Sequence, residues 1–97
     1  MENGRPYKET MLKRNVYFRV FDSSLDPKEL VWHRDNEDRD ILCLEGNGWF
    51  LQKDNQLPVE MIPGKTYCIE RNEWHRVIPH QSKLKLIIIK QNNQNTI

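Results

Sequence analysis

The sequence has little of several features that mark specialised classes of protein. Its 97 residues include only two cysteines, too few for the disulfide framework of a small secreted domain. No uninterrupted apolar run exceeds four residues, whereas a membrane-spanning helix needs about 20. The net charge is only +1, so the surplus of cations that binding to nucleic-acid phosphates requires is absent. We therefore expect neither a membrane protein nor a nucleic-acid-binding protein.

The first residues also lack the apolar segment of a signal peptide, because residues 1–14 are polar and charged. Hydrophobic residues make up 37% and charged residues 30% of the chain, a composition that is polar but globular. A chain of this length builds one hydrophobic core. We expect a single cytoplasmic domain.

Turn residues recur every eight to twelve positions, and no segment has a helical apolar period. The segments between the turns are short and rich in aromatic and β-branched residues, which predicts about eight strands in a sandwich or barrel. The predicted strands are residues 15–21, 30–33, 39–44, 49–52, 58–62, 65–70, 74–78 and 84–90. We place the barrel at residues 14–90, after a polar N-terminal segment (1–13) and before a mobile polar tail (91–97).

Two segments carry histidines at a characteristic spacing. The first follows the pattern H-x-D-x3-R-x6-G from His33 to Gly46, and the second follows G-x5-E-x-N-x2-H from Gly64 to His75. Both spacings, and the seventeen residues between the two glycines, resemble the two motifs of small cupins. The resemblance covers about residues 30–90 and implies an all-β fold, a cupin-like double-stranded β-helix or jelly-roll barrel.

The resemblance also implies a metal site that this sequence has altered. Cupins bind a metal ion through three histidines and a glutamate; here Asp35 replaces the second histidine and Arg39 the glutamate. Asn72 stands where the second motif has a glycine, a mild change because asparagine tolerates the left-handed backbone conformation.

Strand alternation in the cupin register predicts which side chains face the barrel interior. Phe50 and Gln52 would point inward and Trp49 outward. A slip of one residue would instead bring Asp38 or Asp40 into the pocket. The polar side chains that converge in this register are His33, Asp35, Arg39 and His75.

Three hypotheses for function follow. The one we favour is a metal-free pocket in which Asp35 pairs with Arg39, and which binds a polar or anionic small molecule through Arg39, Gln52 and the two histidines. The alternative is an enzyme, an oxygenase or isomerase, that holds Fe(II) or another divalent metal (Mn, Ni or Zn) on His33, Asp35 and His75. The third is an interaction module with a vestigial pocket. The fold alone does not choose between these classes.

Residues 41–44 are apolar on both faces of their strand, so something must cover the outer face. The candidates are the N-terminal segment and a second subunit. Because exposed apolar faces are commonly interfaces and two-fold dimers are the commonest oligomers, we expect a homodimer.

Overall fold

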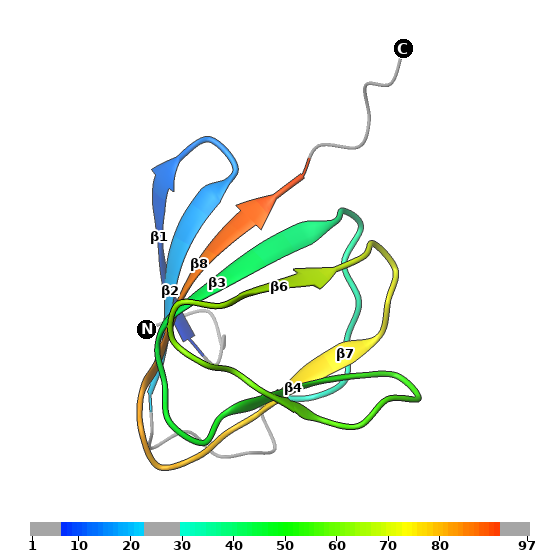
Figure 1. Cartoon of the computed structure of the whole chain (residues 1–97). Helices are drawn as coiled ribbons and strands as arrows, with labels where there is room; N and C mark the ends of the chain where they lie inside the picture. Colours follow the sequence, from blue (N-terminus) through cyan, green and yellow to red (C-terminus); the bar gives the residue numbers. More distant parts are fainter. Residues whose placement is uncertain (1–6, 23–29, 92–97) are drawn as a thin grey trace.

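A computed structural model describes residues 7–22 and 30–91, which form eight strands and no helix (Figure 1). No described segment is therefore a helix long and apolar enough to cross a membrane. The strands are β1 (Tyr7–Lys13), β2 (Val16–Phe21), β3 (Arg39–Glu45), β4 (Phe50–Lys53), β5 (Val59–Glu60), β6 (Thr66–Ile69), β7 (His75–Ile78) and β8 (Leu84–Lys90).

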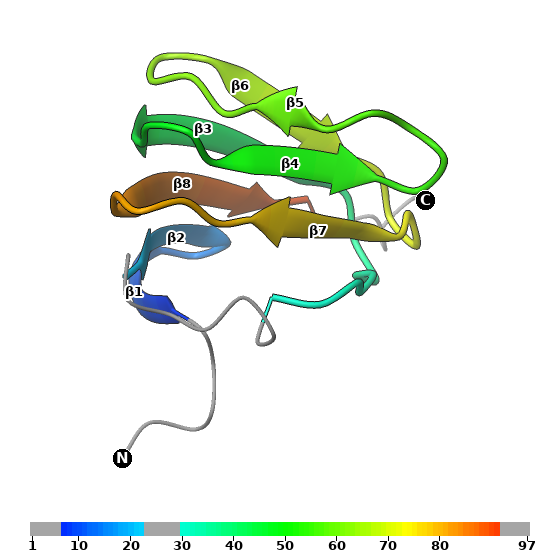
Figure 2. The same cartoon turned by 90° about the horizontal axis from the view of Figure 1, so that it is seen from below.

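The strands make two antiparallel sheets that face each other (Figure 2). The larger sheet has the order β1-β2-β8-β3-β6, and the smaller has the order β5-β4-β7. This arrangement confirms the predicted all-β class. The crossovers matter for the site, since they bring β3 and β8 together at the centre of the larger sheet, opposite β7.

The alternation of side chains along β8 shows how the core is built. Leu84, Leu86 and Ile88 are buried between the sheets, whereas the residues between them point away. This is the period-2 pattern of a strand with one face on a core. The same parity points Lys90, the last residue of β8, into the interior.

The N-terminal segment differs from the prediction, because the sheet begins at Tyr7 rather than at residue 14. The strand is polar, yet it is held by Glu9, whose carboxylate accepts two hydrogen bonds from the buried Arg19 guanidinium. The Tyr7 ring packs on Phe21 at 5.2 Å between centroids. Strand β1 therefore extends the edge of the larger sheet and does not cover the outer face of β3, where Leu44 is 44% exposed.

Two other predicted segments need correction. Residues 30–33 do not form a strand; only His33 makes a bridge, to His75. In the hairpin after β3, the register is one residue away from the prediction. Trp49 is fully buried, donates its indole N–H to the Ser82 carbonyl at 2.8 Å and shares the inward face with Leu51. The predicted tail lies outside the described residues except for Gln91.

Candidate metal and ligand site

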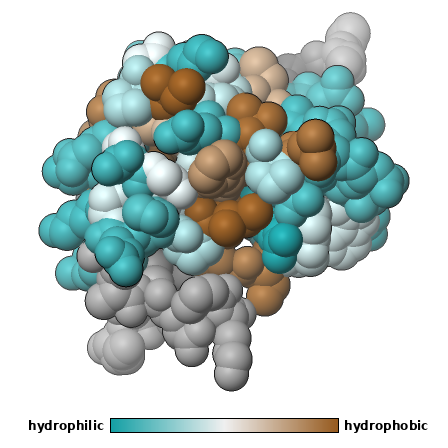
Figure 3. Space-filling model, turned by 60° about the horizontal axis from the view of Figure 1, so that its bottom comes forward, coloured by the Kyte–Doolittle hydropathy of each residue, from teal (hydrophilic) through white to brown (hydrophobic). Residues whose placement is uncertain are grey.

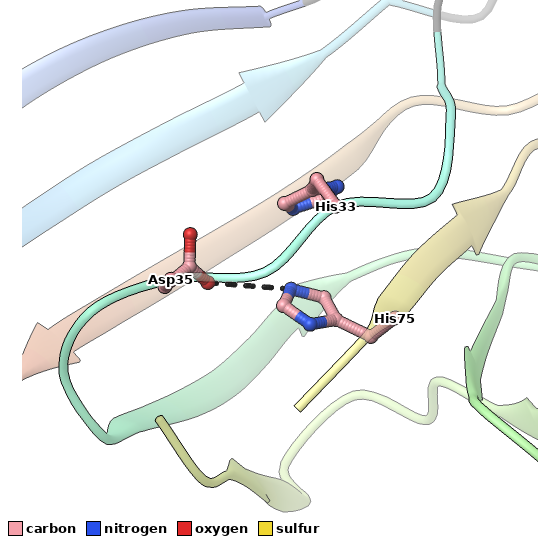
Figure 4. A group of neighbouring side chains, drawn as sticks. All are labelled: His33, Asp35 and His75. Atoms are coloured by element: carbon pink, nitrogen blue, oxygen red, sulfur yellow. Dashed lines mark ion pairs between the residues drawn. The ribbon is translucent and has the colours of Figure 1, made fainter. Parts of the chain in front are cut away.

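His33, Asp35 and His75 come together because the segment before β3 is fastened to the start of β7 (Figure 4). The backbone N–H of His33 donates to the His75 carbonyl at 3.0 Å, and that of His75 donates to the His33 carbonyl at 2.9 Å. The Asn72 N–H donates to the Asp35 carbonyl at 2.7 Å. Asn72 has a φ of 63°, the left-handed conformation expected for it.

The three side chains have the spacing of a candidate metal-ligand group. One ligand atom from each lies within 4.8 Å of the others. The His33 and His75 rings meet edge to face, with centroids 4.3 Å apart, and Asp35 Oδ2 lies 3.4 Å from His75 Nε2. His75 is 4% exposed, whereas His33 is open to solvent on one side, so the group connects the interior with the surface.

Backbone carbonyls fix the tautomer that each imidazole has when it is neutral. His33 Nδ1 is 2.9 Å from the Val31 oxygen, and His75 Nδ1 is 2.8 Å from the Glu73 oxygen. A carbonyl only accepts, so each Nδ1 carries the proton and each neutral ring keeps its Nε2 lone pair for the site. Burial, above all, lowers the pKa of His33 and favours this neutral form.

The two oxygens of Asp35 have different surroundings. Oδ1 lies 3.2 Å from Arg39 Nη2, and Oδ2 is buried without a hydrogen-bond partner among the described residues. Arg39 also binds Glu37 Oε2, at 2.8 Å from both Nη2 and Nε. Burial raises the pKa of Asp35, but His75 and Arg39 together outweigh that effect, so the pKa is lowered and the carboxylate stays ionised.

A cavity of about 330 Å³ adjoins the three residues. The lining includes charged and polar groups, among them Arg39, Arg19 and Lys90. The rest is apolar, so the space suits a small amphiphilic molecule. The apolar lining includes Phe21, Ile41, Leu51, Met61, Ile69, Val77, Leu86 and Ile88.

The outside of the molecule near β4 and β7 carries separate apolar patches among polar side chains (Figure 3).

Of the predicted pocket residues, the structure brings together His33, Asp35, Arg39 and His75, and it excludes two. Phe50 and Gln52 do not line the cavity; Leu51 between them does. Gln52 instead accepts a hydrogen bond from Arg76 Nε at 3.0 Å on the outside of the smaller sheet. The cause is the one-residue difference in the hairpin register, which exchanges the two faces of β4.

The alternative register, with Asp38 or Asp40 in the pocket, is also excluded. Asp38 accepts from the Arg71 N–H at 2.7 Å, and Asp40 accepts from the Cys68 thiol at 3.1 Å. Neither residue lines the cavity.

The sequence interpretation missed three charged residues of the cavity: Glu9, Arg19 and Lys90. Lys90 continues the inward-facing alternation of Leu86 and Ile88, which would have identified it. Glu9 had no such signal, because its segment is polar throughout and its partner lies on another strand.

No protein-family model matches the sequence, and neither does any curated protein. Solved structures do match. A cupin superfamily protein from Desulfitobacterium hafniense superposes with a TM-score of 0.69 over 95% of this chain and 82% of its own, at 16% identity. The chain has the cupin fold.

Two further structures share this cupin fold. The DMSP lyase DddQ from Ruegeria pomeroyi has a TM-score of 0.70 and 12% identity, covering 84% of this chain. The Fe(II) form of HppE, in complex with its substrate, has a TM-score of 0.64 and 14% identity, covering 88% of this chain. This chain spans 40% of the first protein and 52% of the second.

Proposed function

We propose that the barrel holds a divalent metal ion on His33, Asp35 and His75 and binds a small molecule in the adjoining cavity. One observation carries the proposal: Asp35 Oδ2 is buried, accepts no hydrogen bond from any residue that the structure describes, and faces the Nε2 atom of His75 at 3.4 Å. With the Nδ1 proton already donated to a carbonyl, a neutral His75 presents a lone pair to this oxygen. Two facing acceptors need a cation between them, and either a metal ion or a second proton on His75 would supply one. The convergence of a third donor, from His33, within 4.8 Å of the other two favours the metal ion.

The surroundings of the three ligands support the proposal. Metal-bound histidines usually donate their second ring N–H to a carbonyl or carboxylate, which orients the ring and fixes the tautomer. Both histidines here make that contact. Arg39 orients Asp35 in a similar way, since it binds one carboxylate oxygen and leaves the other directed at His75.

Two histidines and one carboxylate are the donor set that Fe(II) enzymes use, and an Fe(II) ion held this way would keep open positions for oxygen and substrate. HppE, which shares the fold, was crystallised in an Fe(II) form with its substrate. We therefore place Fe(II) first among the divalent metals, ahead of Mn, Ni and Zn. The reaction would be an oxygenation or an isomerisation of the bound molecule.

The metal-free pocket is the second candidate, and the Asp35–Arg39 ion pair that it predicts is present at 3.2 Å. That pair satisfies only one oxygen of Asp35. With a neutral His75, the other oxygen of the metal-free pocket stays buried without a hydrogen bond from any described residue, at a cost of about 1–3 kcal/mol, and a bound metal ion would remove this cost. The vestigial-pocket hypothesis predicts a filled barrel, and the cavity of about 330 Å³ speaks against it.

Elemental analysis tests the proposal directly, on protein purified without an affinity tag or chelator and then titrated with Fe(II), Mn(II), Ni(II) and Zn(II). We expect near-stoichiometric metal that is lost in His33→Ala and His75→Ala, because two ligands hold a divalent ion poorly. The matched control is His80→Ala, which removes an exposed histidine outside the group. Absence of metal, together with no thermal shift on adding any of the four ions, would overturn the proposal.

A further inference from the structure

Three cationic side chains line the cavity, and internal carboxylates neutralise two of them. Arg19 is paired with Glu9. Arg39 is paired with Asp35 and Glu37, at 3.2 and 2.8 Å. Lys90 differs, because it forms no ion pair with any carboxylate in the described parts of the chain.

The position of Lys90 is nevertheless well fixed. It lies directly opposite Arg39 in the pairing of β8 with β3, and its backbone N–H donates to the Asn15 carbonyl at 2.8 Å. Its ammonium nitrogen lies 4.4 Å from the centroid of the Tyr17 ring, a cation–π contact. The side chain is thus held at the cavity by the sheet on one side and an aromatic face on the other.

Two cations side by side at a partly buried position repel each other. Burial first, and then the charge of Arg39, lower the pKa of Lys90, and the charges of Glu9 and Glu37 offset this only in part. An anion bound beside the ammonium would offset both effects, since it pairs with Lys90 and screens it from Arg39. Most of the other lining residues are apolar, among them Ile41, Leu51 and Ile88.

We infer that the cavity takes a small carboxylate with an apolar body, its carboxylate bound by the Lys90 ammonium and its body packed among the apolar side chains. The inference deepens the ligand-binding part of the proposed function and does not require the metal. It also moves the recognition of an anion from Arg39, where the sequence placed it, to Lys90, because Arg39 is already occupied by Asp35 and Glu37.

The test uses hexanoate and hexanamide, which have the same apolar chain but differ in charge. Calorimetric titration is performed on the full chain, both after EDTA treatment and after metal loading. We expect hexanoate to bind at least about tenfold more tightly than hexanamide, because a charge-assisted hydrogen bond exceeds a neutral one. Lys90→Met should remove this preference while keeping the length of the side chain, and Lys90→Arg should retain it.

The matched control is Lys85→Met, on the same strand but on the outer face, where Lys85 pairs with Glu45 at 3.2 Å. It should leave the preference unchanged. Equal binding of the two probes, or an undiminished preference in Lys90→Met, would overturn the inference. Hexanoate binding that requires metal and survives Lys90→Met would show that the anion is a metal ligand, which overturns the inference but not the proposed function. A Lys90-dependent preference for hexanoate in protein that binds no metal would support the inference and overturn the proposed metal site.

Discussion

Arg39 holds Asp35 through one carboxylate oxygen only, with Nη2 at 3.2 Å from Oδ1, and leaves Oδ2 turned toward His75. Both side chains are nearly buried, with exposed fractions of 13% and 11%. Arg39 is therefore at once a stabilising partner and the group that orients Asp35.

Removing this guanidinium should destabilise the fold. Arg39→Ala leaves Asp35 and Glu37 without their cation, and breaking a buried pair costs about 3–5 kcal/mol. Urea unfolding measures the loss, and Lys85→Ala, which breaks a surface pair, should cost less than about 1 kcal/mol. A loss for Arg39→Ala no larger than that of the control would show that the pair contributes little to stability.

The exposed thiol of Cys68 should react slowly at pH 8. It donates a hydrogen bond to Asp40 Oδ1 at 3.1 Å, and this bond, with the negative charge of Asp40, raises the pKa of the thiol. The thiolate is the reactive form, so its fraction at a given pH is reduced and grows as pH rises toward the raised pKa. Asp40→Asn should accelerate alkylation by iodoacetamide several-fold. Cys43, fully buried, should stay unmodified in both folded proteins and serves as the internal reference.

The backbone at Asn72 should prefer glycine to any branched residue. With a φ of 63°, a residue other than glycine or asparagine costs roughly 1–2 kcal/mol there. Asn72→Gly should change the free energy of unfolding by only a few tenths of a kcal/mol, whereas Asn72→Val should lower it by about 2 kcal/mol. Equal stabilities of the two variants would show that the turn adapts to its side chain.

A homodimer through the outer face of the larger sheet remains our prediction. Leu42 lies opposite Ile87, which in turn lies opposite Phe18, so apolar residues on three adjacent strands share this face. Leu42→Glu should yield the monomer mass in light scattering. The matched control is Lys83→Glu, which introduces the same charge at an exposed residue just before β8, outside this face. A monomer mass for the unchanged protein would contradict the prediction.

Much of the fold was predictable because the strand alternation and the motif spacings are local. Leu84, Leu86 and Ile88 identify β8 and its buried face from sequence alone. The same motifs placed His33 and His75 in the site, and Asp35 and Arg39 beside them. What was missed depends on partners distant in the sequence. Glu9 lies opposite Arg19 in the pairing of β1 with β2, and no local pattern in its own segment predicts that pairing.

The register of β4 shows a second limit of local patterns. Trp49 directly follows a turn, and a large aromatic residue at a turn is compatible with either face. The Ser82 carbonyl, far along the chain, accepts the indole N–H, and this contact favours the inward orientation of Trp49. Phe50 and Gln52 are displaced from the cavity as a consequence. Lys90, by contrast, could have been predicted from the alternation of inward-facing residues along β8. It was missed because the two cupin motifs have no position that corresponds to it.

The mutual backbone bonds between His33 and His75 also tie the candidate site to the course of folding. The two residues belong to segments far apart along the chain, so the proposed ligands meet only after the long loop between them has closed. No short fragment contains the site, and a partly folded chain would expose its histidines singly. The rate of metal binding during refolding would therefore report when β7 packs against the segment before β3.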